Sequence, residues 1–141
     1  MRAVDTNVLV RLITRDDPAQ VEAAQAYIAA GVRVSTLALA ETIWVLRSTY
    51  GQSAVDQVNA LRMLLGNAQV AFEDRELVEA ALEEFDGTPG LSFSDCLIVQ
   101  SARKAGDTLG TFDRKLAKVE GTELIGKSSN QPPHRARSRR S

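Results

Sequence analysis

Two kinds of apolar segment alternate along residues 1–126. The short segments are rich in valine or bounded by threonine and glycine, a pattern typical of β-strands. They predict five strands, at Ala3–Asp5, Val32–Ser35, Val70–Phe72, Thr108–Phe112 and Glu123–Ile125.

The longer segments carry apolar residues at helical spacing and have helix start and stop signals at their borders. The predicted helices begin at Asp17, Thr36, Ser53, Glu73 or Asp74, and Ser92, and they end near Gly31, Gly51, Gly66, Phe85 and Gly106. Strands separated by helices require crossover connections and therefore favour a parallel sheet covered on both faces. The predicted fold is an α/β domain, a three-layer α/β/α sandwich with a central parallel sheet of about five strands.

The net charge of −1 averages two unlike parts of the chain. Residues 1–126 hold 12 Lys and Arg against 18 Asp and Glu, whereas residues 127–141 hold five cations and no acid. We therefore expect one domain over residues 1–126 and a basic, disordered tail over residues 127–141, either solvated or in contact with nucleic acid. The first five residues do not resemble a secretory signal, and no apolar run is long enough to span a membrane, so we expect a cytoplasmic protein.

The chain has one cysteine, Cys96, and one histidine, His134, which lies in the tail. These counts exclude zinc hydrolases, Cys/His and Ser/His nucleophile systems, and ribonucleases that use a pair of histidines. Cys96 is expected to pack as a small apolar side chain.

Four carboxylates lie where strands end or inside otherwise uncharged helical segments. Asp5 ends the first predicted strand and Asp113 directly follows the fourth. Glu41 is the only charge between Thr36 and Leu46, and Asp95 is the only charge between Leu91 and Val99. Ligands bind beyond the carboxyl ends of parallel strands, and a carboxylate taken out of water needs a partner or a cation. Oxygen ligands without His or Cys favour Mg²⁺ or Mn²⁺. Taken singly, Asp5, Asp95 and Asp113 also suit local roles as turn formers or helix caps.

At these residues the chain resembles the PIN-domain nucleases, in particular the VapC-type ribonuclease toxins of toxin–antitoxin pairs. The similar segments are residues 4–9 (VDTNVL), 40–46 (AETIWVL), 93–98 (FSDCLI) and 111–116 (TFDRKL). The resemblance implies that Asp5, Glu41, Asp95 and Asp113 are catalytic residues that bind one or two Mg²⁺ ions, and that Asn7 and Thr111 support them. It also implies an RNA substrate attacked by water, an antitoxin partner, and a homodimer for which Leu61, Leu64 and Leu65 are candidate interface or core residues.

Other functions stay open at this point. The same acids suit a DNA-directed or solitary PIN-type nuclease, or a catalytically silent metal-binding interaction module. A phosphatase that forms an aspartyl-phosphate is disfavoured, because it needs a second acid where this chain has Asn7. No substrate-binding residue is identified, although several cations suit either a phosphate backbone or a solvated surface: Arg11, Arg15, Arg47, Arg103, Lys104, Arg114 and Lys115.

Overall fold

The computed structural model describes residues 1–126, so the predicted basic tail at 127–141 lies outside the described residues. Its strands are β1 (Arg2–Ala3), β2 (Val32–Val34), β3 (Val70–Phe72), β4 (Leu109–Thr111) and β5 (Thr122–Leu124). All pairings are parallel, which confirms the predicted α/β class with parallel strands. The sheets are small, however, since the strands form one sheet in the order β1-β2-β3 and a separate pair β4-β5.

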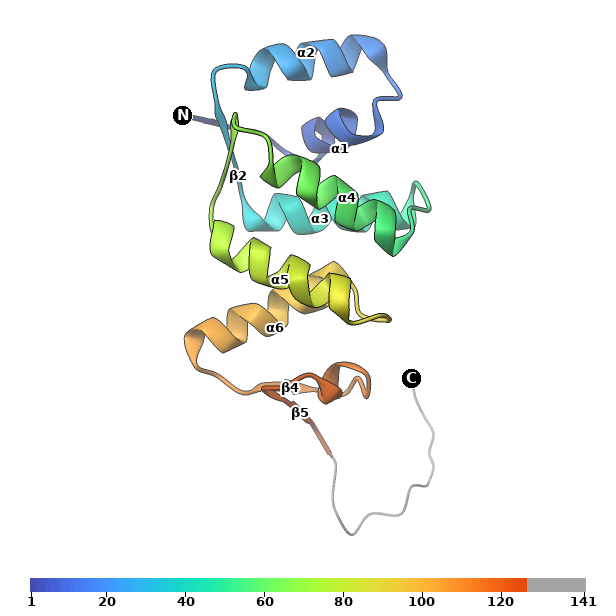
Figure 1. The fold of residues 1–141 in the computed structure, drawn as a ribbon, viewed down its shortest axis with the longest axis vertical. Helices are drawn as coiled ribbons and strands as arrows, with labels where there is room; N and C mark the ends of the chain where they lie inside the picture. Colours follow the sequence, from blue (N-terminus) through green and yellow to red (C-terminus); the bar gives the residue numbers. More distant parts are fainter. Residues whose placement is uncertain (127–141) are drawn as a thin grey trace.

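Six α-helices and one 3₁₀ turn make up most of the rest of the described chain. They are α1 (Thr6–Thr14), α2 (Pro18–Ile28), α3 (Thr36–Ser48), α4 (Ala54–Leu65), α5 (Arg75–Gly87), α6 (Phe93–Ala105) and η1 (Leu116–Lys118). Figure 1 shows the helices stacked along the long axis, from α2 at the top to α6, with β4 and β5 below α6. None of the helices within residues 1–126 is long and apolar enough to cross a bilayer.

The predicted helix starts coincide with observed caps, with one correction. Asp17, Ser53, Asp74 and Ser92 each accept a hydrogen bond from a backbone N–H of the following turn. The cap of α3 is Ser35 rather than the predicted Thr36, because the Ser35 hydroxyl accepts the Ala38 N–H at 3.0 Å. Side chains of this kind satisfy N–H groups that have no partner inside the helix.

Helix α1 is absent from the sequence-based prediction. Its segment is rich in β-branched residues, which favour strands and weaken a helical prediction. Asp5 was predicted to end a strand, but it instead caps α1, accepting the Val8 N–H at 3.3 Å. Burial of Leu9, Val10 and Leu12 against the core stabilises the helix beyond its local propensity.

One apolar core runs through the helix stack. Leu9, Leu39 and Leu46 are completely buried in it. Cys96 is also fully buried, as predicted, and burial raises the pKa of its thiol to about 12. Leu61 and Leu64 belong to this core as well, so they are not available for an interface.

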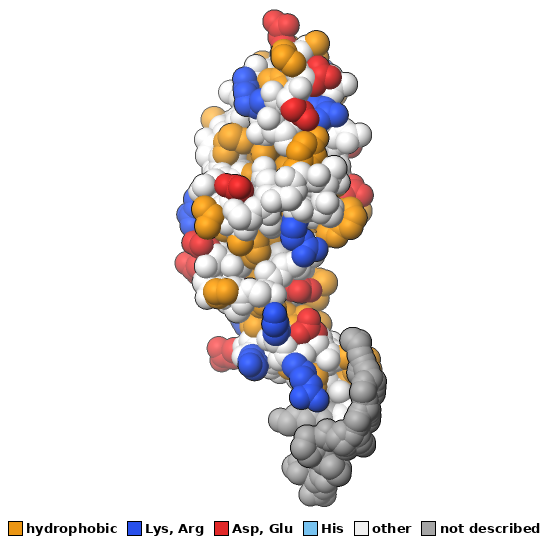
Figure 2. All heavy atoms as spheres, turned by 90° about the vertical axis from the view of Figure 1, so that its right-hand side faces the viewer, with side chains coloured by type: hydrophobic (Ala, Val, Ile, Leu, Met, Phe, Trp, Pro, Cys, Tyr) orange, Lys and Arg blue, Asp and Glu red, His pale blue; other side chains and the backbone are white. Residues whose placement is uncertain are grey.

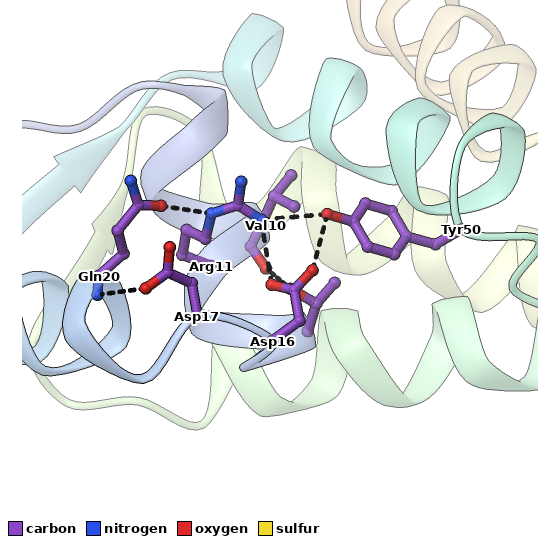
Figure 3. A network of polar contacts seen from close by, with 7 residues as sticks. Val10, Arg11, Asp16, Asp17, Gln20 and Tyr50 are labelled. Atoms are coloured by element: carbon purple, nitrogen blue, oxygen red, sulfur yellow. Dashed lines mark hydrogen bonds and ion pairs between the residues drawn. The ribbon is translucent and has the colours of Figure 1, made fainter.

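Arg11 sits at the centre of a polar network that fixes the corner between α1 and α2 (Figure 3). Its guanidinium donates to Gln20 Oε1 at 2.5 Å, to Asp16 Oδ1 at 3.0 Å and to the Tyr50 hydroxyl at 3.1 Å. The Thr14 hydroxyl also donates to Asp16, and this bond is the main cause of a lowered pKa at Asp16. Arg11 therefore ties the α1–α2 corner to the segment after α3.

Candidate functional site

Thr6, which directly follows Asp5, connects the first two candidate acids by a hydrogen bond to Glu41. The Thr6 hydroxyl donates to Glu41 Oε1 at 2.5 Å and so joins the start of α1 to the middle of α3. Helices α1 and α3 pack against each other, and Glu41 is exposed while Thr6 is half-buried. The structure thus brings the first two predicted acids into one neighbourhood.

Asp95 lies in the first turn of α6 and is half-buried. Its backbone N–H donates to the Ser92 hydroxyl at 3.1 Å, which makes Ser92 the cap of the helix. A negative charge in the first turn also interacts favourably with the helix dipole. Helix α3, which carries Glu41, packs against α1 and α6. Asp5 caps α1 and Asp95 lies in α6.

Asp113 lies in the turn between β4 and η1, and backbone groups hold it there. Its Oδ1 accepts the N–H groups of Lys115 at 2.8 Å and Leu116 at 3.2 Å. Its own N–H donates to the Thr111 hydroxyl at 2.9 Å. Thr111 therefore contacts the Asp113 backbone, which is consistent with the supporting role that the resemblance implies.

Asn7 has a different setting from Thr111. It is exposed on the first turn of α1, where it lines a mainly apolar cavity of about 290 Å³ together with Tyr27. The hydrogen bond to Glu41 comes from the neighbouring Thr6 instead. The sequence signal for Thr6 was its hydroxyl within residues 4–9, but nothing in the spacing paired it with Glu41.

The four acids do not form a compact cluster in the described arrangement. Within residues 1–126 no three carboxylates lie close enough together to hold one metal ion. Asp5, Glu41 and Asp113 are exposed to water, so burial alone does not require a cation at them. The oxygen-only donors fit a hard divalent ion chemically, but their arrangement does not present a complete site, and we derive no reaction step through a metal.

Lys104, one of the candidate cations, is engaged in an ion pair. Its Nζ lies 2.5 Å from Asp74 Oδ2 and links the end of α6 to the cap of α5. This hydrogen bond is the main cause of the lowered pKa of Asp74 and of the raised pKa of Lys104. Lys104 therefore has a structural partner, as Arg11 does.

A family model described as the PIN domain matches residues 2–122. The chain belongs to the PIN-domain family. The match confirms the predicted PIN-type ribonuclease, a hydrolase of phosphodiester bonds; nucleases of this family generally depend on a divalent metal ion. Among solved structures, the chain is similar to Mycobacterium tuberculosis VapC20, a sarcin-ricin loop cleaving toxin, with 22% identity, 84% of this chain and 94% of that chain covered, and a TM-score of 0.42. No curated protein matches the chain significantly.

Proposed function

We propose that this PIN domain is a Mg²⁺-dependent endoribonuclease and the toxin of a toxin–antitoxin pair. Asp5, Glu41, Asp95 and Asp113 are its catalytic carboxylates. The family match carries the proposal, because it spans all four acids. Mg²⁺ is the preferred ion, with Mn²⁺ as a substitute, since both favour ligand sets made only of oxygen atoms.

Local hydrogen bonds orient three of these carboxylates. Asp5 and Asp113 accept backbone N–H groups through Oδ1, and Glu41 accepts the Thr6 hydroxyl through Oε1. A carboxylate held through one oxygen has fewer orientations to lose when its other oxygen binds a ligand. In the proposed reaction Thr6 is therefore a positioning residue for Glu41, and Thr111 supports the turn of Asp113 by accepting its backbone N–H.

The proposal includes two macromolecular partners and a location. The substrate is RNA, and a cognate antitoxin covers the acidic residues. The nuclease domain comprises residues 1–126, functions as a homodimer in the cytoplasm, and is followed by the basic segment at 127–141. A short reading frame for a DNA-binding protein directly upstream of this gene would support the toxin assignment, whereas its absence would favour a solitary nuclease.

A direct cleavage assay tests the enzymatic part. End-labelled RNA and DNA of the same sequence are incubated with the full chain in Mg²⁺, in Mn²⁺ and in EDTA, with Asp5→Asn as the variant. We expect cuts in RNA only, abolished by EDTA and by the substitution. Cleavage of DNA would support a DNA-directed enzyme, and metal uptake without cleavage of either polymer would support a silent binding module.

A further inference from the structure

A cavity of about 500 Å³ lies between the end of α5, the loop that follows it, α6 and η1. Three cations line it, Arg103, Lys115 and Lys118, together with the acids Glu84 and Glu120. Glu84 accepts a hydrogen bond from Gln100 at 2.8 Å. The remaining walls are neutral, so the cavity has an excess of positive charge.

Two of the cations are held at the cavity by the backbone around them. Arg103 donates to the Glu120 carbonyl at 2.5 Å. Lys115 passes over Gly90, where an added Cβ would lie 3.4 Å from the lysine Nζ and 3.5 Å from its Cδ. Gly90 also has a φ of +97°, a conformation that favours glycine. The loop is therefore shaped to let Lys115 lie against it.

The same turn joins this cavity to a predicted catalytic residue and to an exposed aromatic ring. Asp113 Oδ1 accepts the Lys115 N–H, so Lys115 begins next to the carboxylate and ends at the cavity. Phe112, directly before Asp113, is 77% exposed. Lys115 is three positions after Phe112, so their Cα atoms are at most about 11 Å apart.

Many proteins that bind single-stranded nucleic acid combine exposed aromatic rings with basic side chains on one surface. Unpaired bases stack on aromatic rings, and cations contact the sugar-phosphate backbone. Large aromatic side chains are otherwise buried in most proteins, because their exposure to water is unfavourable. Packing within residues 1–126 thus leaves Phe112 available for a ligand.

The charge distribution also favours this end of the molecule for a polyanion. Residues 1–92 hold seven Lys and Arg against thirteen Asp and Glu, whereas residues 93–126 hold five of each. Two of those five acids are Asp95 and Asp113, the predicted catalytic residues. Figure 2 shows Lys and Arg side chains, with Asp and Glu side chains among them, over the lower end of the molecule, the end that carries β4 and β5 in Figure 1.

We propose that Phe112 and this cavity form a contact surface for single-stranded RNA. Phe112 stacks on an unpaired base, and Arg103, Lys115 and Lys118 bind a backbone phosphate next to the turn that holds Asp113. This proposal rests on the proposed ribonuclease function and identifies the surface to which the RNA substrate binds.

Binding without cleavage tests this surface. A fluorescent single-stranded RNA oligonucleotide is titrated with the full chain in EDTA, so that no metal-dependent cleavage occurs. Phe112→Ala should weaken binding by about 5-fold or more, the effect of losing one stacked base, while Phe112→Trp should bind like wild type. Lys115→Ala with Lys118→Ala should lower the slope of log affinity against log salt by about 1.4.

Matched substitutions outside the contact surface show whether a loss of RNA binding is specific to that surface or follows from removing any exposed apolar or basic side chain. Val55→Ala changes an apolar residue that is 68% exposed, and Arg62→Ala removes an exposed cation, both on α4. Both should bind RNA like wild type. Unchanged binding by the Phe112 and lysine variants, equal losses in the α4 variants, or equal affinity for duplex RNA would overturn the proposal.

The outcomes also distinguish this surface from the enzyme assignment. If wild type cleaves RNA while the Phe112 and lysine variants bind it normally, the contact surface is wrong and the nuclease stands. If RNA binds through these residues but is never cleaved with Mg²⁺ or Mn²⁺, the surface stands and the nuclease assignment fails. Thermal unfolding of each variant checks that the exposed substitutions leave the fold intact.

Discussion

Residues 1–92 and residues 93–126 differ in how much of them is buried. The first part contributes most of the core, and its central strand β2 buries both Val32 and Val34. In the second part the core residues come from α6, with Leu116 as the exception. Neither β4 nor β5 contains a buried residue.

The residues that stabilise the fold are therefore largely different from the segments that carry Asp5 and Asp113. Segments with few buried apolar contacts open at lower free energy than the core does. β1, which precedes Asp5, and β4, which precedes Asp113, are both strands without buried residues. Asp5 and Asp113 thus lie at weakly packed borders of the molecule, whereas Glu41 and Asp95 lie on core helices. Substitutions in each part test whether one site uses both.

Single Asp-to-Asn substitutions in the two parts give the largest expected effect. A site that spans both parts should lose cleavage with Asp5→Asn and with Asp113→Asn alike, by at least about 100-fold, since metal-assisted charge stabilisation is worth several kcal/mol. The measurement is the initial rate of cleavage of labelled RNA in Mg²⁺. Asp107→Asn, an exposed acid near β4, is the matched control and should leave the rate unchanged. Normal cleavage by Asp113→Asn would remove residues 93–126 from the site.

Asp95→Asn separates a catalytic carboxylate from a helix cap. If Asp95 is catalytic, the substitution should abolish cleavage. Because the Ser92 hydroxyl supplies the cap of α6, the substitution should cost the metal-free protein no more than about 1 kcal/mol, the contribution of one charge to the helix dipole. Urea unfolding in EDTA measures this. A clear loss of stability would instead indicate that Asp95 serves the helix.

Truncating a core leucine in each part should show which part determines global stability. Leu39 is completely buried on α3, and Leu39→Ala should lower the free energy of unfolding by about 2–5 kcal/mol. Leu116 is 7% exposed and anchors η1 in the smaller part. Leu116→Ala should mainly speed hydrogen exchange in β4 and β5. Urea unfolding and amide exchange measure the two effects, and an equal global loss from both would show that the parts unfold together.

The sequence predicted the elements that depend on local signals and missed those that depend on packing. All five strands and the caps Asp17, Ser53 and Ser92 follow from local patterns, since strand length, side-chain caps and glycine stops act within a few residues. Helix α1 was missed because burial of Leu9 and Leu12 outweighs its β-branched composition. The split into two sheets was missed because strand order is not encoded in any local pattern.

The four candidate acids come from the sequence and stay a prediction, whereas the contacts around them could not be predicted from it. The positions of the carboxylates at the ends of strands and the starts of helices identified the four acids, and the family match spans them. The Thr6–Glu41 hydrogen bond joins residues 35 positions apart and depends on how α1 packs on α3. Glu41 is exposed although its neighbours are apolar, because α3 buries its Leu39 and Ile43 face and leaves Glu41 on the opposite face.

Removing the Thr6 hydroxyl should have a smaller effect than removing an acid. Thr6→Val leaves the helix cap at Asp5 in place and deletes only the hydrogen bond to Glu41. Cleavage should fall about 10-fold, as expected for one hydrogen bond to a charged group. Thr6→Ser should restore the wild-type rate. Full activity in Thr6→Val would exclude a positioning role for Thr6.

The pH dependence of stability is the smallest expected effect, and it also compares the two parts. A hydrogen bond from the Thr14 hydroxyl lowers the pKa of Asp16, and one from Lys104 lowers the pKa of Asp74. Both pKa values lie below the ordinary aspartate value of 3.8. A lowered native pKa stabilises the fold above pH 3.8, and this stabilisation is lost as the pH falls through the native pKa. The raised pKa of Lys104 acts in the opposite range: its stabilisation is present below pH 10.5 and is lost above it.

Urea midpoints across both pH ranges distinguish the two carboxylates. Asp16 and its ion-pair partner Arg11 both lie in residues 1–92, whereas the Asp74–Lys104 pair joins the two parts. Asp16→Asn should reduce the acid dependence alone, and Asp74→Asn should reduce both the acid dependence and the alkaline dependence. An unchanged alkaline dependence in Asp74→Asn would show that the pair does not couple α5 to α6 in solution.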